Sequence, residues 1–550
     1  MSYMLGVYVV VAFVALVLYK LVLHVWSIST TPLRHLPGPP SKSLLWGNNE
    51  TIKKEEHSVV QERWAAEYGQ TIAYQGAFGR WHLWTMDPRA LHHVLTHPAV
   101  YKRSVASRFV LSRLLGPGLL VTEDEQHKQQ RRVLSPAFGP AQVRALTEVF
   151  VDKSNELRDC LLAEVSRAGD GASARVDANA WLTRATLDII GLAGFGHDFA
   201  SLTPAGRENE LGGAMATLFT APHAQNGRSG RFVSFLQATF PLLRLFKTEG
   251  NRRSERAQAA MRRIGMRLIA EKKAAILEEK GSGGGGGVER KDITERDLLT
   301  LLIRANMATD IPESQRLTDD EVLAQVPTFI VAGHETTSTA TTWALFALAQ
   351  RPHVQSKLRE ELLGSPTDSP TMDELNALPY LDAVVRETLR FHSPVPKLRR
   401  EVFRDDVIPV DTPYTDRHGR VRSYIEIRKG DTVNIPILAI NRRKELWGED
   451  AHEFRPERWE NIPEAAGSVP GVWANLLTFS GGHRACIGFR FSIVETKALL
   501  FALIRGFEFE LAVPAGDIEK RSAVVTHPVV VGPDGKAKRS LPVIIKPVRA

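Results

Sequence analysis

The stretch of residues 479–488 is the part of this chain best suited to chemistry. It contains Cys486, one of two cysteines among 550 residues, with an arginine two positions before it and glycines on both sides. An apolar run over residues 487–504 follows with helical spacing. A thiol at a helix start has its thiolate favoured by the helix dipole and by free backbone N–H groups. Gly482 and Gly488 are expected to adopt unusual dihedral angles and to let a flat ligand approach the backbone. A thiolate ligand of haem iron needs these properties.

Two other interpretations of Cys486 stay open from the residues alone. A free cysteine at a helix start is commonly a buried core residue. A zinc site with His483 is also conceivable, but structural zinc needs four N or S ligands, and the chain has no CxxC and no second Cys-His cluster. Cys160 lies in an amphipathic stretch over residues 153–165 and is interpreted as core. No intrachain disulfide then remains, consistent with a reducing compartment.

The loop resembles the F-x-x-G-x-R-x-C-x-G signature of the cytochrome P-450 family, carried here by Phe479, Gly482, Arg484, Cys486 and Gly488. The resemblance implies that haem b is the cofactor and that Cys486 is the axial ligand of its iron. It also implies that Arg484 holds a haem propionate and that Phe479 packs beneath the loop. The fold it implies is mainly α with small β-sheets, with one catalytic domain over residues 46–550.

A second region with unusual chemistry lies in a long predicted helix. Residues 318–321 form a capping box that opens it, and the apolar pattern continues to about Gln350, before Pro352. Its middle, residues 332–339, contains a glycine, an acid and four hydroxyl residues. Helix propensity argues against this choice, and such local conflicts tend to mark function.

The hydroxyl of Thr336 can donate to the carbonyl of Ala332 and bend the helix. Gly333 is expected to open a notch for dioxygen and water, and an acid beside an alcohol can relay protons. The segment matches the family's A/G-G-x-D/E-T-T/S motif at Ala332, Gly333, Glu335, Thr336 and Thr337. The resemblance implies that Thr336 handles oxygen and that Glu335 relays protons. The alternative is that Thr336 only bonds the backbone and Glu335 only forms a surface pair.

Charged residues downstream resemble the family's supporting frame. Glu387 and Arg390 lie three apart on one helix face, a common arrangement that contributes only about 0.2–0.5 kcal/mol when exposed. Residues 454–459 resemble the P-E-R-F motif, with Trp459 in place of Phe. In the family, Glu387, Arg390 and Arg458 would form a buried charged triad that braces the cysteine loop.

Further basic residues resemble partners of the haem propionates. His127 and Arg131 match the family's W-x-x-x-R pattern, with His in place of Trp, and their spacing puts them on one helix face. The spacing to Asp405 favours Arg400 as another propionate partner, with Arg399 as a competitor. Each of these could instead be a solvated surface residue.

The substrate pocket is expected to form over the haem and from segments that vary in the family. By family position the candidates are Phe329, Ala332, Val395, Leu398, Val524 and residues 104–115. Phe329, Val395 and Leu398 are equally well explained as ordinary core residues.

Residues 3–23 are apolar except for Lys20, and about 20 helical residues cover a bilayer core. A cleaved signal peptide would have basic residues before the apolar run and a small-residue cleavage site after it, and neither is present. Basic residues follow the run, which predicts a cytosolic body. The linker over residues 24–45 carries a proline-rich hinge that resembles endoplasmic-reticulum members of the family. The sequence therefore predicts a single-pass anchor in the endoplasmic reticulum membrane with a cytosolic catalytic domain.

Other patterns bound the organisation of the body. Residues 71–75 and 81–85 predict a β-hairpin, residues 421–427 and 543–545 predict strands, and the glycine-rich residues 281–287 predict a flexible loop. The net charge of +8 is scattered along the chain. A scattered charge forms no reading face, which argues against nucleic acid as a partner.

The motifs look most like those of fungal microsomal members of the family. That resemblance implies a monooxygenase that inserts one atom of O2 into a lipophilic small molecule, such as a terpenoid secondary metabolite. Electrons would come from NADPH through a separate NADPH–cytochrome P-450 reductase. One alternative is a haem-thiolate isomerase or dehydratase, which tends to depart from the threonine motif and turns over without NADPH. Another is a non-catalytic haem-binding protein, which would be unaffected by Thr336→Ala.

Overall fold

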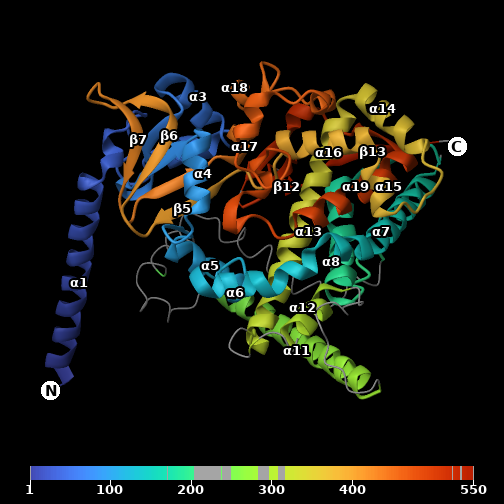
Figure 1. Cartoon of the computed structure of the whole chain (residues 1–550), viewed down its shortest axis with the longest axis horizontal. Coiled ribbons are helices and arrows are strands. Elements are labelled where there is room, and N and C mark those ends of the chain that lie inside the picture. Colours follow the sequence, from blue (N-terminus) through green and yellow to red (C-terminus); the bar gives the residue numbers. More distant parts are fainter. Residues whose placement is uncertain are drawn as a thin grey trace. The chain divides into compact units, whose positions relative to one another are not determined.

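The computed structural model describes residues 2–169, 171–203, 237, 249–282, 297–307, 312, 316–522, 524–532 and 535–548. The chain forms two compact units (Figure 1). Unit 1 consists of Met1–Lys102, Pro396–Leu446 and Glu464–Ala485, and unit 2 consists of Arg103–Val395, Trp447–Pro463 and Cys486–Ala550.

Unit 1 is built on a mixed five-stranded sheet with the strand order β1-β2-β8-β5-β3. The strands are β1 (Thr71–Gln75), β2 (Trp81–Thr85), β3 (Tyr101–Lys102), β5 (Leu398–Val402) and β8 (Thr432–Ile435), and a separate pair is formed by β6 (Asp406–Thr415) and β7 (Val421–Ile427). The predicted hairpin is confirmed, with β1 antiparallel to β2. In β5, Arg399 lies opposite Asn434 of β8 and Arg400 lies opposite Val433. Because successive residues of a strand point to opposite faces, these two arginines leave the sheet on opposite sides.

Helices of unit 1 are α1 (Ser2–Thr30), α2 (Asn49–Lys54), α3 (Val59–Tyr68), α4 (Pro88–Thr96) and α17 (Ile437–Asn441), and α18 (Lys444–Trp447) leads out of it. Its 3-10 turns are η1 (Pro32–His35), η2 (Ala77–Gly79), η9 (Glu464–Ser468), η10 (Leu477–Phe479) and η11 (Gly482–Arg484).

The N-terminal helix differs from its prediction in extent. α1 continues to Thr30, seven residues beyond the expected end at residue 23 and into the expected linker. Within the described chain, no helix combines the length and the apolar character needed to cross a bilayer.

The proline hinge that follows is docked on the sheet of unit 1. The backbone N–H of Ala73 in β1 donates to the Pro37 carbonyl at 2.9 Å. Gly38 has φ +149°, and a Cβ there would lie 2.2 Å from the Ala73 carbonyl oxygen. The glycine is therefore required by the close approach of hinge and strand.

Unit 2 is mainly helical. Its helices are α5 (Val105–Leu115), α6 (Asp124–Leu134), α7 (Pro140–Arg167), α8 (Ala178–Phe195), α11 (Glu249–Ser282), α12 (Leu298–Met307), α13 (Asp319–Ala349), α14 (Pro352–Leu363), α15 (Met372–Asn376), α16 (Pro379–Phe391) and α19 (Phe489–Gly506). Its 3-10 turns are η3 (Ser135–Phe138), η8 (Pro456–Glu460) and η12 (Ala515–Asp517). Of the glycine-rich segment over residues 281–287, all beyond Ser282 lies outside the described residues.

Two three-stranded sheets complete unit 2. One has the order β4 (Ala174–Asp177), β13 (Pro542–Pro547), β9 (Phe507–Leu511), and the other has the order β10 (Ile518–Ser522), β11 (Thr526–Val531), β12 (Ala537–Arg539). The strands expected at residues 421–427 and 543–545 are confirmed as β7 and part of β13.

The long helix α13 organises the core of unit 2. Its capping box is present as expected, with the Thr318 hydroxyl accepting from the Glu321 N–H. The helix spans 31 residues, includes Pro327, and packs against α8 and α19. Near its C-terminus, the buried Trp343 donates from Nε1 to the Thr526 carbonyl at 2.8 Å. α13 is thus packed against two helices and, near its C-terminus, against a sheet.

Candidate active site

Cys486 lies three residues before α19 and is an exposed residue. Desolvation by surrounding protein raises the pKa of its thiol, whereas a hydrogen bond from the Gly488 N–H and the Arg131 guanidinium both lower it. Arg131 is therefore close enough to act electrostatically on the sulfur. A sulfur with an N–H donor and a nearby cation is suited to bind a metal as thiolate.

The preceding part of the loop belongs to unit 1 and is tightly packed. Gly482 has φ +64°, and a Cβ there would lie 2.3 Å from the Leu95 carbonyl oxygen. Phe479 is buried, with its ring centroid 5.7 Å from that of Trp473. The expected unusual dihedral angle is confirmed for Gly482 and is wrong for Gly488, whose φ is −92°. A Cβ at Gly488 would make only ordinary contact with Phe138, so this position needs its N–H rather than its conformational freedom.

The expected propionate partners fall in both units. His127 is buried on α6, one turn before the half-buried Arg131, which confirms the predicted helix. Arg484 ends η11 in unit 1. Arg400 is buried and donates to the Arg399 carbonyl, while Arg399 is exposed and its Nε is 3.4 Å from Asn434 Oδ1. The opposite orientations in β5 separate the two arginines but leave their assignment to a propionate a proposal.

The middle of α13 has the predicted hydroxyl-to-backbone bond. The Thr336 hydroxyl donates to the Ala332 carbonyl at 2.7 Å, and Ala332 itself is exposed in the middle of the helix. The notch expected at Gly333 is wrong, because a Cβ there would lie 2.9 Å from Ile190 Cδ1 of α8. Gly333 therefore permits close packing of two helices, and the open position is Ala332.

Glu335 is held in a partly buried cluster of ion pairs. Its Oε1 lies 3.1 Å from an Arg539 side-chain nitrogen on β12 and 3.3 Å from His527 Nε2 on β11. Desolvation raises the pKa of this carboxyl, but His527 and Arg539 outweigh it and lower the pKa to about 2. At neutral pH Glu335 is therefore a carboxylate without a proton to relay. The ion-pair interpretation is the one that this geometry favours, although the pair is not on the open surface.

A second acid, which the sequence analysis did not predict, lies on α19, a helix that packs against α13. Glu495 of α19 is fully buried, and neither of its carboxylate oxygens has a hydrogen-bond partner. Burial raises its pKa well above the usual range, while the Thr337 hydroxyl acts weakly in the opposite direction. The Thr337 hydroxyl also lies 3.1 Å from that of Ser492. Glu495 is thus a buried acid with a raised pKa next to the hydroxyl-rich stretch of α13.

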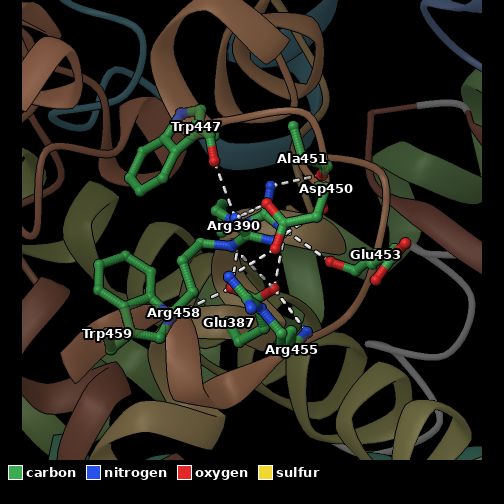
Figure 2. Close-up of polar contacts among 9 residues, drawn as sticks. All are labelled: Glu387, Arg390, Trp447, Asp450, Ala451, Glu453, Arg455, Arg458 and Trp459. Carbon is green, nitrogen blue, oxygen red and sulfur yellow. Dashed lines mark hydrogen bonds and ion pairs between the residues drawn. The ribbon is translucent and has the colours of Figure 1, made fainter. Parts of the chain in front are cut away.

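Glu387 and Arg390 form a fully buried ion pair on α16 (Figure 2). The guanidinium donates to both carboxylate oxygens, at 2.9 and 2.7 Å. It also donates to the carbonyls of Ala451 and Glu453 at 2.7 and 2.9 Å. The pair therefore ties α16 to the segment that follows α18.

Arg458 joins this cluster, as its position in the P-E-R motif predicts. Its Nε lies 3.6 Å from Glu387 Oε1, and it donates to the Trp447 carbonyl at 2.8 Å and the Asp450 carbonyl at 2.7 Å. An ion pair with the Asp450 carboxylate completes its contacts. The structure brings together all three members of the expected triad, and Asp450 is a fourth charged member.

The substitution of Trp for Phe in that motif has a structural use. Trp459 Nε1 donates to Glu387 Oε2 at 3.1 Å, a bond that phenylalanine could not make. The Arg455 N–H donates to Glu387 Oε1 at 2.9 Å (Figure 2). Four groups thus interact with one buried carboxylate. The replacement of Phe by Trp in the motif is the feature of the sequence that could have predicted the indole bond.

The predicted pocket residues differ in exposure. Ala332 and Val524 are exposed, and Val395 and Leu398 are half-buried. Phe329 is buried, with its ring centroid 5.4 Å from that of Phe138. Its contacts are those of a core residue, the alternative that the sequence left open.

The zinc and core alternatives can also be compared with the geometry. Across the described residues, no three His, Cys, Asp or Glu side chains are grouped as metal ligands would be. Cys160 is half-buried on α7 rather than a core residue as expected, and it forms no disulfide.

The residues around Cys486 fit haem bound through an axial thiolate. Cys486 is an exposed residue, the Gly488 N–H and Arg131 favour the anionic form of its sulfur, and Arg131 is a cation that can pair with a carboxylate. The chain also matches the family model described as Cytochrome P-450 over residues 37–531.

Similar proteins extend over nearly the whole chain. Cytochrome P-450 monooxygenase 205 of Postia placenta is 52% identical over 98% of this chain and 97% of its own length. Cytochrome P-450 monooxygenase claQ of Ampulloclitocybe clavipes is 37% identical over 92% of each chain. A ganoderic acid synthetase of Ganoderma lucidum is 35% identical over 90% of this chain and 91% of its own.

The chain therefore belongs to the cytochrome P-450 family. It is a cytochrome P-450 monooxygenase, and its cofactor is haem b with a cysteine thiolate as axial ligand.

Gly482→Ala and Gly488→Ala should have opposite outcomes although both change a motif glycine. Left-handed backbone costs a non-glycine residue about 1–2 kcal/mol, and the clash with the Leu95 carbonyl adds to this at Gly482. We expect Gly482→Ala to lose haem and thermal stability and Gly488→Ala to retain both, measured by haem absorbance per protein and by melting temperature. Equal behaviour of the two variants would contradict the packing described for the loop.

Glu387→Ala should leave buried guanidinium groups without their carboxylate. Breaking a buried pair costs about 3–5 kcal/mol, so we expect poorly assembled, haem-free protein rather than a slow enzyme. Glu519→Ala is the matched control because it breaks an exposed pair with Arg521. Haem content per protein distinguishes the two, and normal haem content in Glu387→Ala would refute the bracing role.

Glu335→Gln should change the pH dependence of stability. A carboxyl whose pKa falls from 4.5 to about 2 on folding stabilises the fold above its unfolded pKa, and this stabilisation is lost as pH falls towards 2. The contribution is on the order of 3 kcal/mol. Urea unfolding should give a gap between parent and Glu335→Gln that is largest near pH 6 and shrinks below about pH 4.5. A gap independent of pH would mean that Glu335 is not an ionised partner.

Proposed function

We propose that this monooxygenase inserts one oxygen atom into a lipophilic small molecule, such as a terpenoid secondary metabolite. Electrons would come from NADPH through a separate NADPH–cytochrome P-450 reductase. Its similarity to fungal monooxygenases, including a protein named ganoderic acid synthetase, supports this class of substrate. The observation that carries the proposal is that unit 2 contains both the exposed residue Cys486 and, on α13, the Thr336 hydroxyl one turn after the exposed Ala332.

On the cysteine side, the protein's task is to keep the sulfur anionic. When bound, haem with a thiolate ligand supplies activation of dioxygen and favours O–O cleavage. The Gly488 N–H and Arg131 stabilise negative charge on the sulfur against desolvation. Arg131 has a second task in this proposal, which is to pair with a propionate. The same role is proposed for His127, Arg484 and Arg400.

On the α13 side, Thr336 is proposed to hold water in place for proton delivery. Its hydroxyl proton is engaged by the Ala332 carbonyl, so the oxygen lone pairs are free to accept from water. Ala332 is exposed next to it, which leaves room for that water or for a substrate. An intact threonine motif also favours a monooxygenase over a haem-thiolate isomerase or dehydratase.

The two acids near Thr336 receive different roles from the one predicted by the motif. Glu335 is ionised and fixed by His527 and Arg539, so we assign it a positioning role that orients this part of α13 towards β11 and β12. Glu495 has a raised pKa and lies next to Thr337, and it can hold a proton at its carboxyl oxygen.

Attachment to the endoplasmic reticulum membrane through residues 3–23 is part of the proposal. It rests on the apolar sequence, on the resemblance to microsomal members and on exposed apolar side chains of α1 such as Val11, Val14 and Leu18. Carbonate extraction of a full-length and a 31–550 protein would test it, because only the full-length chain should stay with the membrane.

The substrate class is tested in microsomes that contain the full chain and a fungal reductase. A panel of terpenoids and aromatic lipophiles is first screened for the spectral change that marks loss of the water ligand of haem. Compounds that produce it are then incubated with NADPH and oxygen-18 gas, and we expect products with one labelled oxygen atom by mass spectrometry.

The matched control is Cys486→Ser in the same microsomes, which should lose the thiolate-type absorption with carbon monoxide and form no product. Product without NADPH, or product without the label, would overturn the monooxygenation proposal in favour of an isomerase or dehydratase. Labelled products only from small hydrophilic compounds would overturn the substrate class.

A further inference from the structure

A group of basic side chains, which includes Arg399, gathers on one part of unit 1. The Lys397 cluster consists of Lys53, His57, His82, Lys397 and Arg399, from α2, the α2–α3 connection, β2, the residue before β5, and β5 itself. Electrostatic interactions link Lys397 to His57, Arg399, Lys53 and His82. Five basic groups from four parts of the sequence thus face one another.

Two histidines of this cluster and one neighbouring residue carry buried polar atoms without partners. Both ring nitrogens of His57 and the Nδ1 of the buried His82 are inaccessible to solvent and accept or donate no hydrogen bond. The neighbouring Gln61, also buried, has an unpartnered Oε1. Lys397 is half-buried and makes no hydrogen bond or ion pair with any residue of the described chain. A buried polar group without a partner costs about 1–3 kcal/mol, so such a concentration indicates a missing ligand.

The charges that act on Lys397, His57 and His82 are of one sign. Desolvation lowers the pKa of Lys397 to about 8, helped by Arg399 and Lys53. Desolvation together with Lys397 lowers the pKa of His57 to about 3. The charged groups acting on His82 are Arg399, Arg80 and Lys397, with no acid among them.

The acids nearest in sequence are already paired elsewhere. Glu55 lies 2.6 Å from an Arg63 guanidinium nitrogen, and Glu56 lies 3.5 Å from one of Arg442. No acid is among the groups that shift the pKa of Lys397, His57 or His82, so an anionic ligand would balance the charge there.

The cluster is also separate from the arginine expected to meet a haem propionate. Arg399 and Arg400 leave β5 on opposite faces of the sheet, and Arg399 extends towards Asn434, which bonds Tyr74 at 3.3 Å. Tyr74 in turn stacks on His82 with ring centroids 5.4 Å apart. The cluster thus occupies the Arg399 face.

From these contacts we infer that the Lys397 cluster binds an oxyanion head group carried on a lipophilic molecule, with Lys397 as its principal ion-pair partner. A carboxylate or a phosphate of low charge has the required acceptors, and a half-buried ammonium binds it by a charge-assisted bond. The source is either a small acidic lipophile or an anionic phospholipid.

The experiment measures binding to the purified full-length holoprotein by calorimetry, so it needs no turnover and is independent of the proposed function. The probes are decanoate with decanol as neutral control, and dioctanoyl phosphatidic acid with dioctanoyl phosphatidylcholine as zwitterionic control. We expect one acidic probe to bind and its control to bind at least about tenfold more weakly. Decanoate alone would identify an acidic lipophile, and phosphatidic acid alone an anionic lipid.

Lys397→Gln should weaken acidic-probe binding at least about tenfold, whereas Lys429→Gln, which removes an exposed charge from the same unit, should not. A second readout does not depend on any ligand. Lys397→Met should raise the melting temperature of the ligand-free protein, because it removes a half-buried charge without a partner, and should keep its haem. Equal binding by Lys397→Gln and parent, equal binding of decanoate and decanol, a lower melting temperature, or loss of haem would each overturn the site.

Discussion

The negative charge on the Cys486 sulfur is the constraint on which the rest of this active site depends. Protein around the sulfur disfavours an anion, and among the described residues the Gly488 N–H and the Arg131 guanidinium oppose that effect. The Gly488 N–H at the start of α19 and the Arg131 guanidinium of α6 stabilise the thiolate, and neither group takes up its proton. The loop must therefore be held rigidly, which explains why Gly482 is used where no Cβ would fit.

Rigidity in unit 2 is provided by polar contacts that are costly to leave incomplete. Glu387 receives Arg390, Arg458, the Arg455 N–H and the Trp459 indole, so no charge in this cluster is without a partner. Such a network adds less net stability than its number of bonds suggests, because each ion was first removed from water. Its value is that alternative arrangements of α16 and the segment after α18 would leave a buried charge unpaired.

Local patterns in the sequence predicted the capping box at Thr318, the hairpin of β1 and β2 and the Thr336–Ala332 bond, because each involves residues close together in the chain. Predictions failed where a distant residue decides. Gly333 is explained by Ile190 on another helix, and the ionisation of Glu335 is set by groups on β11 and β12. No spacing rule within α13 contains that information.

The charged groups of this protein differ in whether a group of opposite charge acts on them. Glu335 is ionised because His527 and Arg539 face it, whereas burial raises the pKa of Glu495, on which no cation of the described residues acts. Like Glu495, Lys397 is desolvated and no opposite charge of the described chain acts on its pKa. It differs from Glu495 because basic neighbours surround it and because neither ring nitrogen of the adjacent His57 has a hydrogen-bond partner. An isolated buried acid can become neutral by keeping its proton, but a group of bases is stabilised best by an anion. That difference is why we assign a proton to Glu495 and a ligand to the Lys397 cluster.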